Sequence, residues 1–232
     1  MGKVVAFWSP EKNSGQTSAI LNIASLLLQN NVSVLVIDLE LNNDYAKFQI
    51  IKKSTLFKSL TPLSIRKVST KLHVLCMNNG KIDLTKYDYP TLLKQFMKEY
   101  KSQYDYILID SRDDNLLKHI YNTIDYACIN YDPQTFSNGL AIQQLAKLQR
   151  IAAQNKSVKL LAAIFNKFDK TSKTHQDNLI IFLSAIKNAY PLITLEKVND
   201  LDKRTSKNIT FAKNMIWSNY AVELNKLLKL FK

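Results

Sequence analysis

The stretch that decides the fold is Val4-Val5-Ala6-Phe7-Trp8-Ser9-Pro10-Glu11-Lys12-Asn13-Ser14-Gly15-Gln16-Thr17-Ser18. Its apolar start predicts a strand, its small and polar middle predicts a loop, and the following residues 16–29 have the apolar spacing of a core-facing helix. A strand, a loop and a helix in this order form a phosphate-binding cradle, because exposed amides and the helix dipole attract an anion at the helix start.

Further apolar runs follow along the chain, separated by helical patterns of which 136–154 is the clearest. The runs lie at 32–37, 72–77, 104–109, 126–130, 158–165 and, more weakly, 192–195. Near-continuous apolar strands separated by helices indicate a parallel sheet covered on both faces. We therefore predict an α/β fold in one domain over residues 1–232, with a mostly parallel sheet of about seven strands and helices on both faces. Residues 42–70 are the least regular part of the pattern.

Composition narrows the class of protein. The chain has 232 residues, of which 46% are hydrophobic and 22% charged, as in globular rather than disordered proteins. No run approaches about eighteen apolar residues and no leader pattern precedes the first strand, so we expect a cytoplasmic protein. Cys76 and Cys128 lie in separate apolar runs, which favours buried thiols over a disulfide or a metal site.

The loop after the first strand lacks the usual lysine. A Walker loop ends Gly-Lys-Ser/Thr, with the lysine on the transferred phosphate and the hydroxyl on magnesium; here the ending is Gly15-Gln16-Thr17. The loop resembles that of the ParA/MinD family of ATPases, which is Lys-Gly-Gly-x-Gly-Lys-Thr directly after the first strand. Aligned without a gap, Glu11 falls at the signature lysine, Lys12 and Asn13 at two glycines, and Gln16 at the Walker lysine.

The rest of the chain strengthens this resemblance. Asp38 follows the second apolar run and looks like the family's switch I aspartate, while Asp110 after Tyr104-Asp105-Tyr106-Ile107-Leu108-Ile109 is similar to its Walker B-like strand. Pro133 follows a further run and precedes a serine-containing turn, and Asn166 stands where relatives place an asparagine against adenine. Because ligand sites in open parallel sheets lie beyond the carboxyl ends of the strands, these positions converge.

The resemblance implies a P-loop NTPase fold of the SIMIBI type, with ATP and Mg²⁺ as cofactors, and it assigns site residues. Asp38 and Asp110 would be catalytic, and Thr17, Asp38 and Asp110 would hold the metal. The nucleotide-binding residues would be Lys12, Asn13, Ser14, Gly15, Gln16, Thr17, Ser18, Pro133 and Asn166.

The missing lysines lower the expected activity. Loss of one preorganised donor to the transition state typically costs about 10² to 10³ in rate, so we expect very slow hydrolysis or none. Asn13 in place of a glycine, with the Ser14 side chain next to it, would also crowd the phosphate, which weakens nucleotide binding. An alternative is that Lys12 takes the signature role through a displaced loop. A second alternative is GTP, because Asn166-Lys167-Phe168-Asp169 matches the Asn-Lys-x-Asp pattern of guanine-binding GTPases.

The formal net charge of +13 favours a polyanion such as DNA or an anionic membrane. Two segments, 45–72 and 197–232, are rich in basic residues. The candidate DNA-binding residues are Lys52, Lys53, Arg66, Lys67, Lys203, Arg204 and Lys207. Residues 220–232 form a basic amphipathic pattern that suits packing on the sheet and, less well, membrane contact.

The sequence therefore predicts a ParA-like partition or positioning protein with a degenerate nucleotide site, acting by contacts with DNA and a protein partner. Two alternatives stay open: an active ATPase that cycles between monomer and homodimer, and a scaffold that localises a secretion, pilus or conjugation machine. His73, His119 and His175 are isolated and lack metal-ligand spacing, so we expect them to be structural or at the surface.

Overall fold

A computed structural model describes residues 2–9, 11, 13–39, 55–60, 63–76, 88–112, 117–154, 158–186, 190–199 and 218–231. The strands are β1 (Lys3–Trp8), β2 (Val34–Asp38), β3 (Thr55–Leu60), β4 (Leu63–Lys67), β5 (Leu72–Cys76), β6 (Tyr106–Ser111), β7 (Tyr126–Tyr131), β8 (Lys159–Phe168) and β9 (Leu192–Glu196). The helices are α1 (Gln16–Gln29), α4 (Tyr89–Tyr100), the 3₁₀-helix η2 (Lys118–Thr123), α6 (Asn138–Gln154), α7 (Lys173–Ile186) and α10 (Asn219–Leu230).

The strands form one sheet in the order β3-β4-β5-β2-β6-β1-β7-β8-β9. Across the sheet from β5 to β9, all neighbouring strands are parallel, which confirms the predicted α/β fold. At the other side of the sheet, β4 is antiparallel to both β3 and β5. Nine strands are therefore present in the described residues, rather than about seven. The two additional strands, β3 and β4, lie within the segment 42–70, where lysines and serines interrupt the apolar pattern as is usual at a sheet edge.

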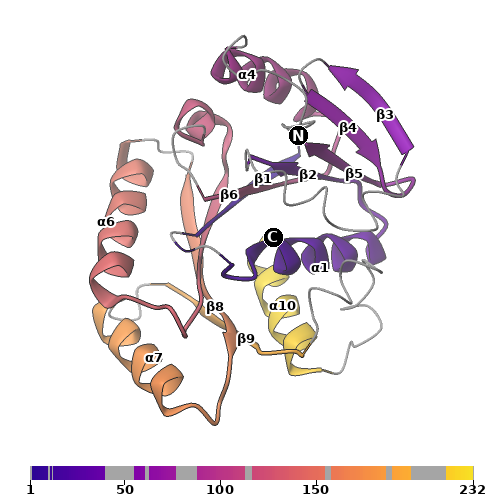
Figure 1. The fold of residues 1–232 in the computed structure, drawn as a ribbon. Helices are drawn as coiled ribbons and strands as arrows, with labels where there is room; N and C mark the ends of the chain where they lie inside the picture. The colour runs from indigo at the N-terminus through magenta and orange to yellow at the C-terminus, as the bar shows by residue number, and fades with distance from the viewer. Residues whose placement is uncertain are drawn as a thin grey trace.

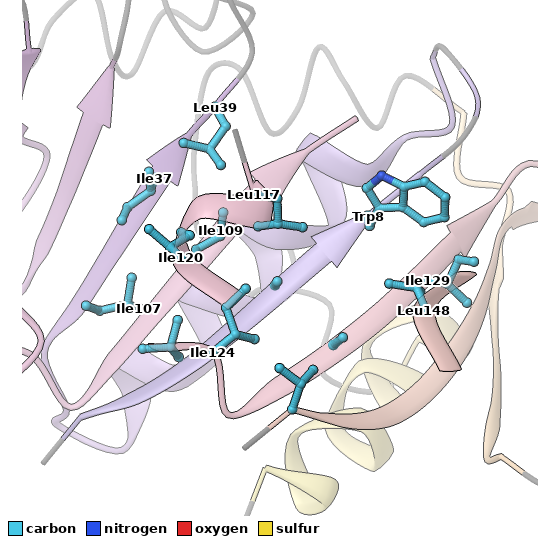
Figure 2. Packing of buried hydrophobic residues seen from close by; sticks show 14 of the residues in the cluster. Trp8, Ile37, Leu39, Ile107, Ile109, Leu117, Ile120, Ile124, Ile129 and Leu148 are labelled. Atoms are coloured by element: carbon cyan, nitrogen blue, oxygen red, sulfur yellow. The ribbon is translucent and has the colours of Figure 1, made fainter. Parts of the chain in front are cut away.

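The sheet buries side chains on both faces. Alternate residues of the central strands pack with α4, η2, α6 and α7 in one cluster, of which Figure 2 shows Ile107, Ile109, Ile120, Ile129 and others. The intervening residues pack with α1 and α10, which lie side by side (Figure 1). This alternation is the period of two expected for strands covered on both faces.

The final helix, α10, belongs to the hydrophobic cluster on the α1 face of the sheet. Ser218 caps α10 by accepting a hydrogen bond from the Ala221 amide at 3.2 Å. Leu224 and Leu227 are fully buried, and Phe231 packs edge to face with Phe7 of β1. The apolar face of α10 is therefore used in the core. No helix in the described ranges combines the length and apolar character needed to span a bilayer.

Candidate nucleotide site

The predicted site residues gather at the carboxyl ends of β1, β2, β6, β7 and β8. The loop after β1 leads directly into α1, whose first residue is Gln16. The flanking strands β6 and β7 pair with β1 in parallel, so their ends lie on either side of this loop. Lys12 lies outside the described residues.

Glycine is required at position 15. Gly15 has a φ of 76°, in the left-handed region, and an added Cβ would lie 2.6 Å from the Asn166 Nδ2 atom. An L-residue with a side chain would therefore be strained by its backbone and would collide with β8. Asn13 also has a positive φ of 58°, which asparagine tolerates better than most residues.

Gln16, at the Walker lysine position, is turned toward the ends of the strands. Its side-chain Nε2 donates to the Asp110 carboxylate at 2.5 Å, to the Phe7 carbonyl at 3.2 Å and to the Ser111 carbonyl at 3.3 Å. The residue is only 5% exposed, and its Oε1 is buried without a partner among the described residues. A buried neutral amide thus bonds the start of α1 to the ends of β1 and β6.

Thr17 and the two aspartates lie near one another at the ends of the strands. The Thr17 hydroxyl donates to the second carboxylate oxygen of Asp110 at 2.7 Å. Asp38 and Asp110 are register partners on the neighbouring strands β2 and β6, and they are 1% and 2% exposed. Hard oxygen ligands of this kind suit Mg²⁺. Among the described residues, no group of three or more His, Cys, Asp or Glu side chains could hold a metal ion.

Glu11, at the signature lysine position, is directed into its own chain. Its carboxylate accepts a hydrogen bond from the Asp132 amide at 2.8 Å and another from the Thr135 side chain. Burial raises the pKa of Glu11 above its ordinary value, and these hydrogen bonds offset only part of that effect. Glu11 therefore links the phosphate loop to the turn that follows β7.

Side chains of β7 and β8 hold the other side of the loop. The ammonium of Lys167 donates to the Asn13 carbonyl and lies 3.2 Å from the Asp132 carboxylate. Asn130 donates through Nδ2 to the Ser14 carbonyl at 3.3 Å, and the buried Asn166 side chain lies against Gly15. Asn130 and Asp132 were not predicted as site residues, and Lys167 was named only within the Asn-Lys-x-Asp pattern of the GTP alternative. Their positions at the carboxyl ends of apolar runs were the available signal.

The remaining assigned residues lie nearby in structural roles. Ser18 is buried in α1, where its carbonyl accepts from Asn22 Nδ2 at 2.8 Å. Pro133 is buried after β7, and its carbonyl accepts from Asn178 at 3.0 Å. The carboxylate of Asp169, which the GTP alternative invokes, accepts from the Thr171 amide at 2.9 Å and the Thr171 hydroxyl at 2.7 Å. These contacts leave the choice between adenine and guanine open.

The histidines have structural contacts. The His73 ring bonds to the Tyr104 hydroxyl at 2.7 Å, and His175 accepts from the Asp169 amide at 3.0 Å. His119 lies on η2 and is partly exposed. Cys128 is buried in β7, which raises its pKa well above the usual range, while the Cys76 side chain lies outside those described.

Two of the candidate DNA-binding residues are described. Arg66 and Lys67 are adjacent on β4, near one edge of the sheet, and Lys67 is exposed. Lys52, Lys53, Lys203, Arg204 and Lys207 lie outside the described residues.

Known proteins match this chain mainly in structure. The chain is similar to a ParA family ATPase from Chlorobium tepidum (TM-score 0.75, 16% identity, covering 98% of this chain and 99% of that one). It is also similar to an ATP complex of McdA from Cyanothece (TM-score 0.74, 12% identity, covering 99% of this chain and 96% of that one). A third similar structure is the cell division ATPase MinD from Pyrococcus furiosus (TM-score 0.70, 17% identity, covering 99% of this chain and 98% of that one). The chain therefore has the fold of the ParA/MinD class of P-loop ATPases, as the sequence predicted.

Sequence comparison adds one relative. The uncharacterised protein MJECL24 of Methanocaldococcus jannaschii is 28% identical over 214 residues, covering 82% of this chain and 81% of the relative. No protein-family model matches the chain.

Proposed function

We propose that this protein is a ParA/MinD-type positioning protein that binds a nucleoside triphosphate weakly, hydrolyses it very slowly or not at all, and acts by binding DNA and a protein partner. The observation that carries the proposal is the hydrogen bond from Gln16 to Asp110, which puts a buried neutral amide at the Walker lysine position. Phosphoryl transfer depends on positive charge around the transferring group, and neither Gln16 nor Glu11 supplies it.

The loop retains groups that fit a weakly bound nucleotide. Gly15 adopts the left-handed conformation that glycine takes most easily, and its lack of a Cβ leaves room for the Asn166 side chain beside the loop. Thr17, Asp38 and Asp110 would hold Mg²⁺, which would neutralise phosphate charge when it is bound. The similarity to an ATP complex of McdA supports ATP as the nucleotide to test first.

The DNA part of the proposal rests on charge. The net charge of +13 attracts a polyanion over long range. Arg66 and Lys67 carry two of these charges on β4, and as consecutive strand residues they project to opposite faces of the sheet. Affinity that arises from phosphate contacts falls steeply as salt is raised, which distinguishes it from partner contacts made through apolar surface.

The test for the nucleotide site is calorimetric titration with Mg-ATP and with Mg-GTP, together with phosphate release with and without duplex DNA. We expect weak binding and negligible release. The variant Glu11→Lys/Gln16→Lys restores both lysines, and we expect it to raise the rate of release by up to about 10². Release by the wild type that DNA stimulates and that Asp38→Ala abolishes would instead establish an active ATPase.

The test for DNA is fluorescence anisotropy with duplex DNA between about 50 and 200 mM salt, where phosphate-driven binding weakens strongly. Arg66→Gln/Lys67→Gln should lower the slope of log affinity against log salt by about 1 to 2. Lys173→Gln, an exposed charge on α7 toward the opposite end of the sheet, is the matched control. If the wild type binds neither nucleotide nor DNA, the proposed function is wrong and the scaffold alternative is favoured.

A further inference from the structure

Both N–H groups of the Gln16 side chain are committed to the protein. A primary amide carries two N–H donors. Gln16 Nε2 faces three acceptors, which are the Asp110 carboxylate at 2.5 Å, the Phe7 carbonyl at 3.2 Å and the Ser111 carbonyl at 3.3 Å. The contact with Asp110 is the shortest, and a carboxylate acceptor strengthens it. Donation by Gln16 to a ligand would therefore require the loss of a buried contact with the strands.

The oxygen of the same amide is the atom that stays uncommitted. Gln16 Oε1 is buried without a hydrogen-bond partner among the described residues, and the whole residue is 5% exposed. The acceptors around Nε2 fix the orientation of this amide, because exchanging its two terminal atoms would set an oxygen against a carboxylate and two carbonyls. Gln16 thus offers a lone pair at the start of α1 and no side-chain donor.

The next side chain of α1 is committed in the same direction. The Thr17 hydroxyl has one hydrogen, which it donates to Asp110 at 2.7 Å, so its remaining lone pairs suit a cation rather than an anion. The main chain differs from these side chains. The amides of Gln16 and Thr17 lie before the first hydrogen bond of the helix, from the Ala19 amide to the Gly15 carbonyl at 3.0 Å. Such amides are where a helix start binds a phosphate group.

Main-chain and side-chain donors serve different phosphate groups in a P-loop. The backbone N–H groups cradle the α- and β-phosphates, whereas the lysine reaches the β- and γ-phosphates. The start of α1 offers main-chain donors for the first kind of contact. For the second kind, Gln16 offers a lone pair beside the buried carboxylate of Asp110. The two kinds of contact are therefore unequally supported.

We propose that Gln16 selects the length of the phosphate chain, so that the site binds a nucleoside diphosphate more tightly than the corresponding triphosphate. This inference rests on the proposed function, which places a nucleotide at the loop and Gln16 at the Walker lysine position. A diphosphate uses the main-chain donors and ends before the position that Gln16 leaves without a donor. A third phosphate adds negative charge toward the Gln16 oxygen and the Asp110 carboxylate, which disfavours it.

The test is calorimetric titration with two pairs of probes, Mg-ADP with Mg-ATP and sodium pyrophosphate with sodium tripolyphosphate. We expect the shorter probe of each pair to bind the wild type about tenfold more tightly, which is the effect of one hydrogen bond to a charged group. Gln16→Lys supplies a charged donor and should remove this preference, by strengthening the binding of the longer probes about tenfold. Gln29→Lys adds the same charge at the exposed last residue of α1 and should keep the wild-type preference.

The ratio of the two affinities separates selectivity from stability, because a loosened loop weakens the binding of short and long probes alike. Equal or tighter binding of the longer probes by the wild type would overturn the inference, as would an unchanged ratio in Gln16→Lys or the same change in Gln29→Lys. Thermal unfolding checks that each variant is folded, and the wild-type ratio decides the matter even if Gln16→Lys is not. Preference for pyrophosphate over tripolyphosphate without binding of either nucleotide would refute the proposed function while supporting the role of Gln16. Binding of none of the probes would refute both.

Discussion

Asp38 and Asp110 are register partners at the carboxyl ends of β2 and β6, and both are almost completely buried. Burying carboxylates is costly unless donors satisfy them. Gln16 and Thr17 bind separate oxygens of Asp110, so the aspartate is held by the two residues that begin α1. The site is therefore a structural joint between β6 and α1 as well as a candidate magnesium site.

Removal of the Asp110 carboxylate should destabilise the fold. Asp110→Ala removes the acceptor of the Thr17 hydroxyl and the shortest of the three hydrogen bonds that Gln16 Nε2 donates, and we expect a loss of about 1 to 3 kcal/mol in the free energy of unfolding. Asp110→Asn keeps one oxygen acceptor and should lose less. Urea unfolding measures both. Equal stability of Asp110→Ala and the wild type would show that the joint contributes nothing.

Two glycine substitutions should change stability in opposite directions. Gly15→Ala forces a side chain into a positive φ and against Asn166, so we expect a loss of about 1 to 3 kcal/mol. Gly139→Ala, in the first turn of α6, meets nothing within 4 Å and should stabilise the protein by up to about 1 kcal/mol. Thermal and urea unfolding provide the comparison, and a stable Gly15→Ala variant would contradict the described loop conformation.

Glu11 should make stability depend on pH. Its pKa is raised above 4.5 in the folded protein, mainly by burial. The carboxyl is protonated in both states at low pH, and the folded state is disfavoured as pH rises through the raised pKa. Glu11→Gln should therefore melt at a higher temperature than the wild type at about pH 7, and the difference should shrink toward about pH 4. A difference that grows on acidification would contradict the direction of the pKa shift.

The last helix should be part of the stable core. Leu224 is fully buried in α10, and Leu224→Ala should cost about 2 to 5 kcal/mol. Val222 on the same helix is 41% exposed, and Val222→Ala should change stability by less than about 0.5 kcal/mol. Denaturant unfolding measures both changes. If Leu224→Ala were neutral while abolishing binding to anionic vesicles, the helix would be a membrane anchor instead.

The sheet was predictable because its central strands are buried on both faces and therefore appear as nearly continuous apolar runs. The helix at 16–29 was predicted with the bounds that the structure has. The edge strands β3 and β4 were missed, since the alternation of polar and apolar residues at 55–67 gives no continuous run. The β3–β4 hairpin is held in the sheet by pairing of β4 with β5, and no pattern within residues 55–67 indicates that pairing.

The sequence by itself determined the class of fold and the position of the loop between β1 and α1, because these depend on local pattern and residue identity. Only the tertiary structure decided which distant side chains contact this loop. The turn of Gln16 toward Asp110, and the reach of Lys167 to Asn13 across more than a hundred intervening residues, depend on β6 and β7 flanking β1 and on β8 lying next to β7. The strand order depends on packing of the whole sheet between two layers of helices. No short segment of the sequence contains that information.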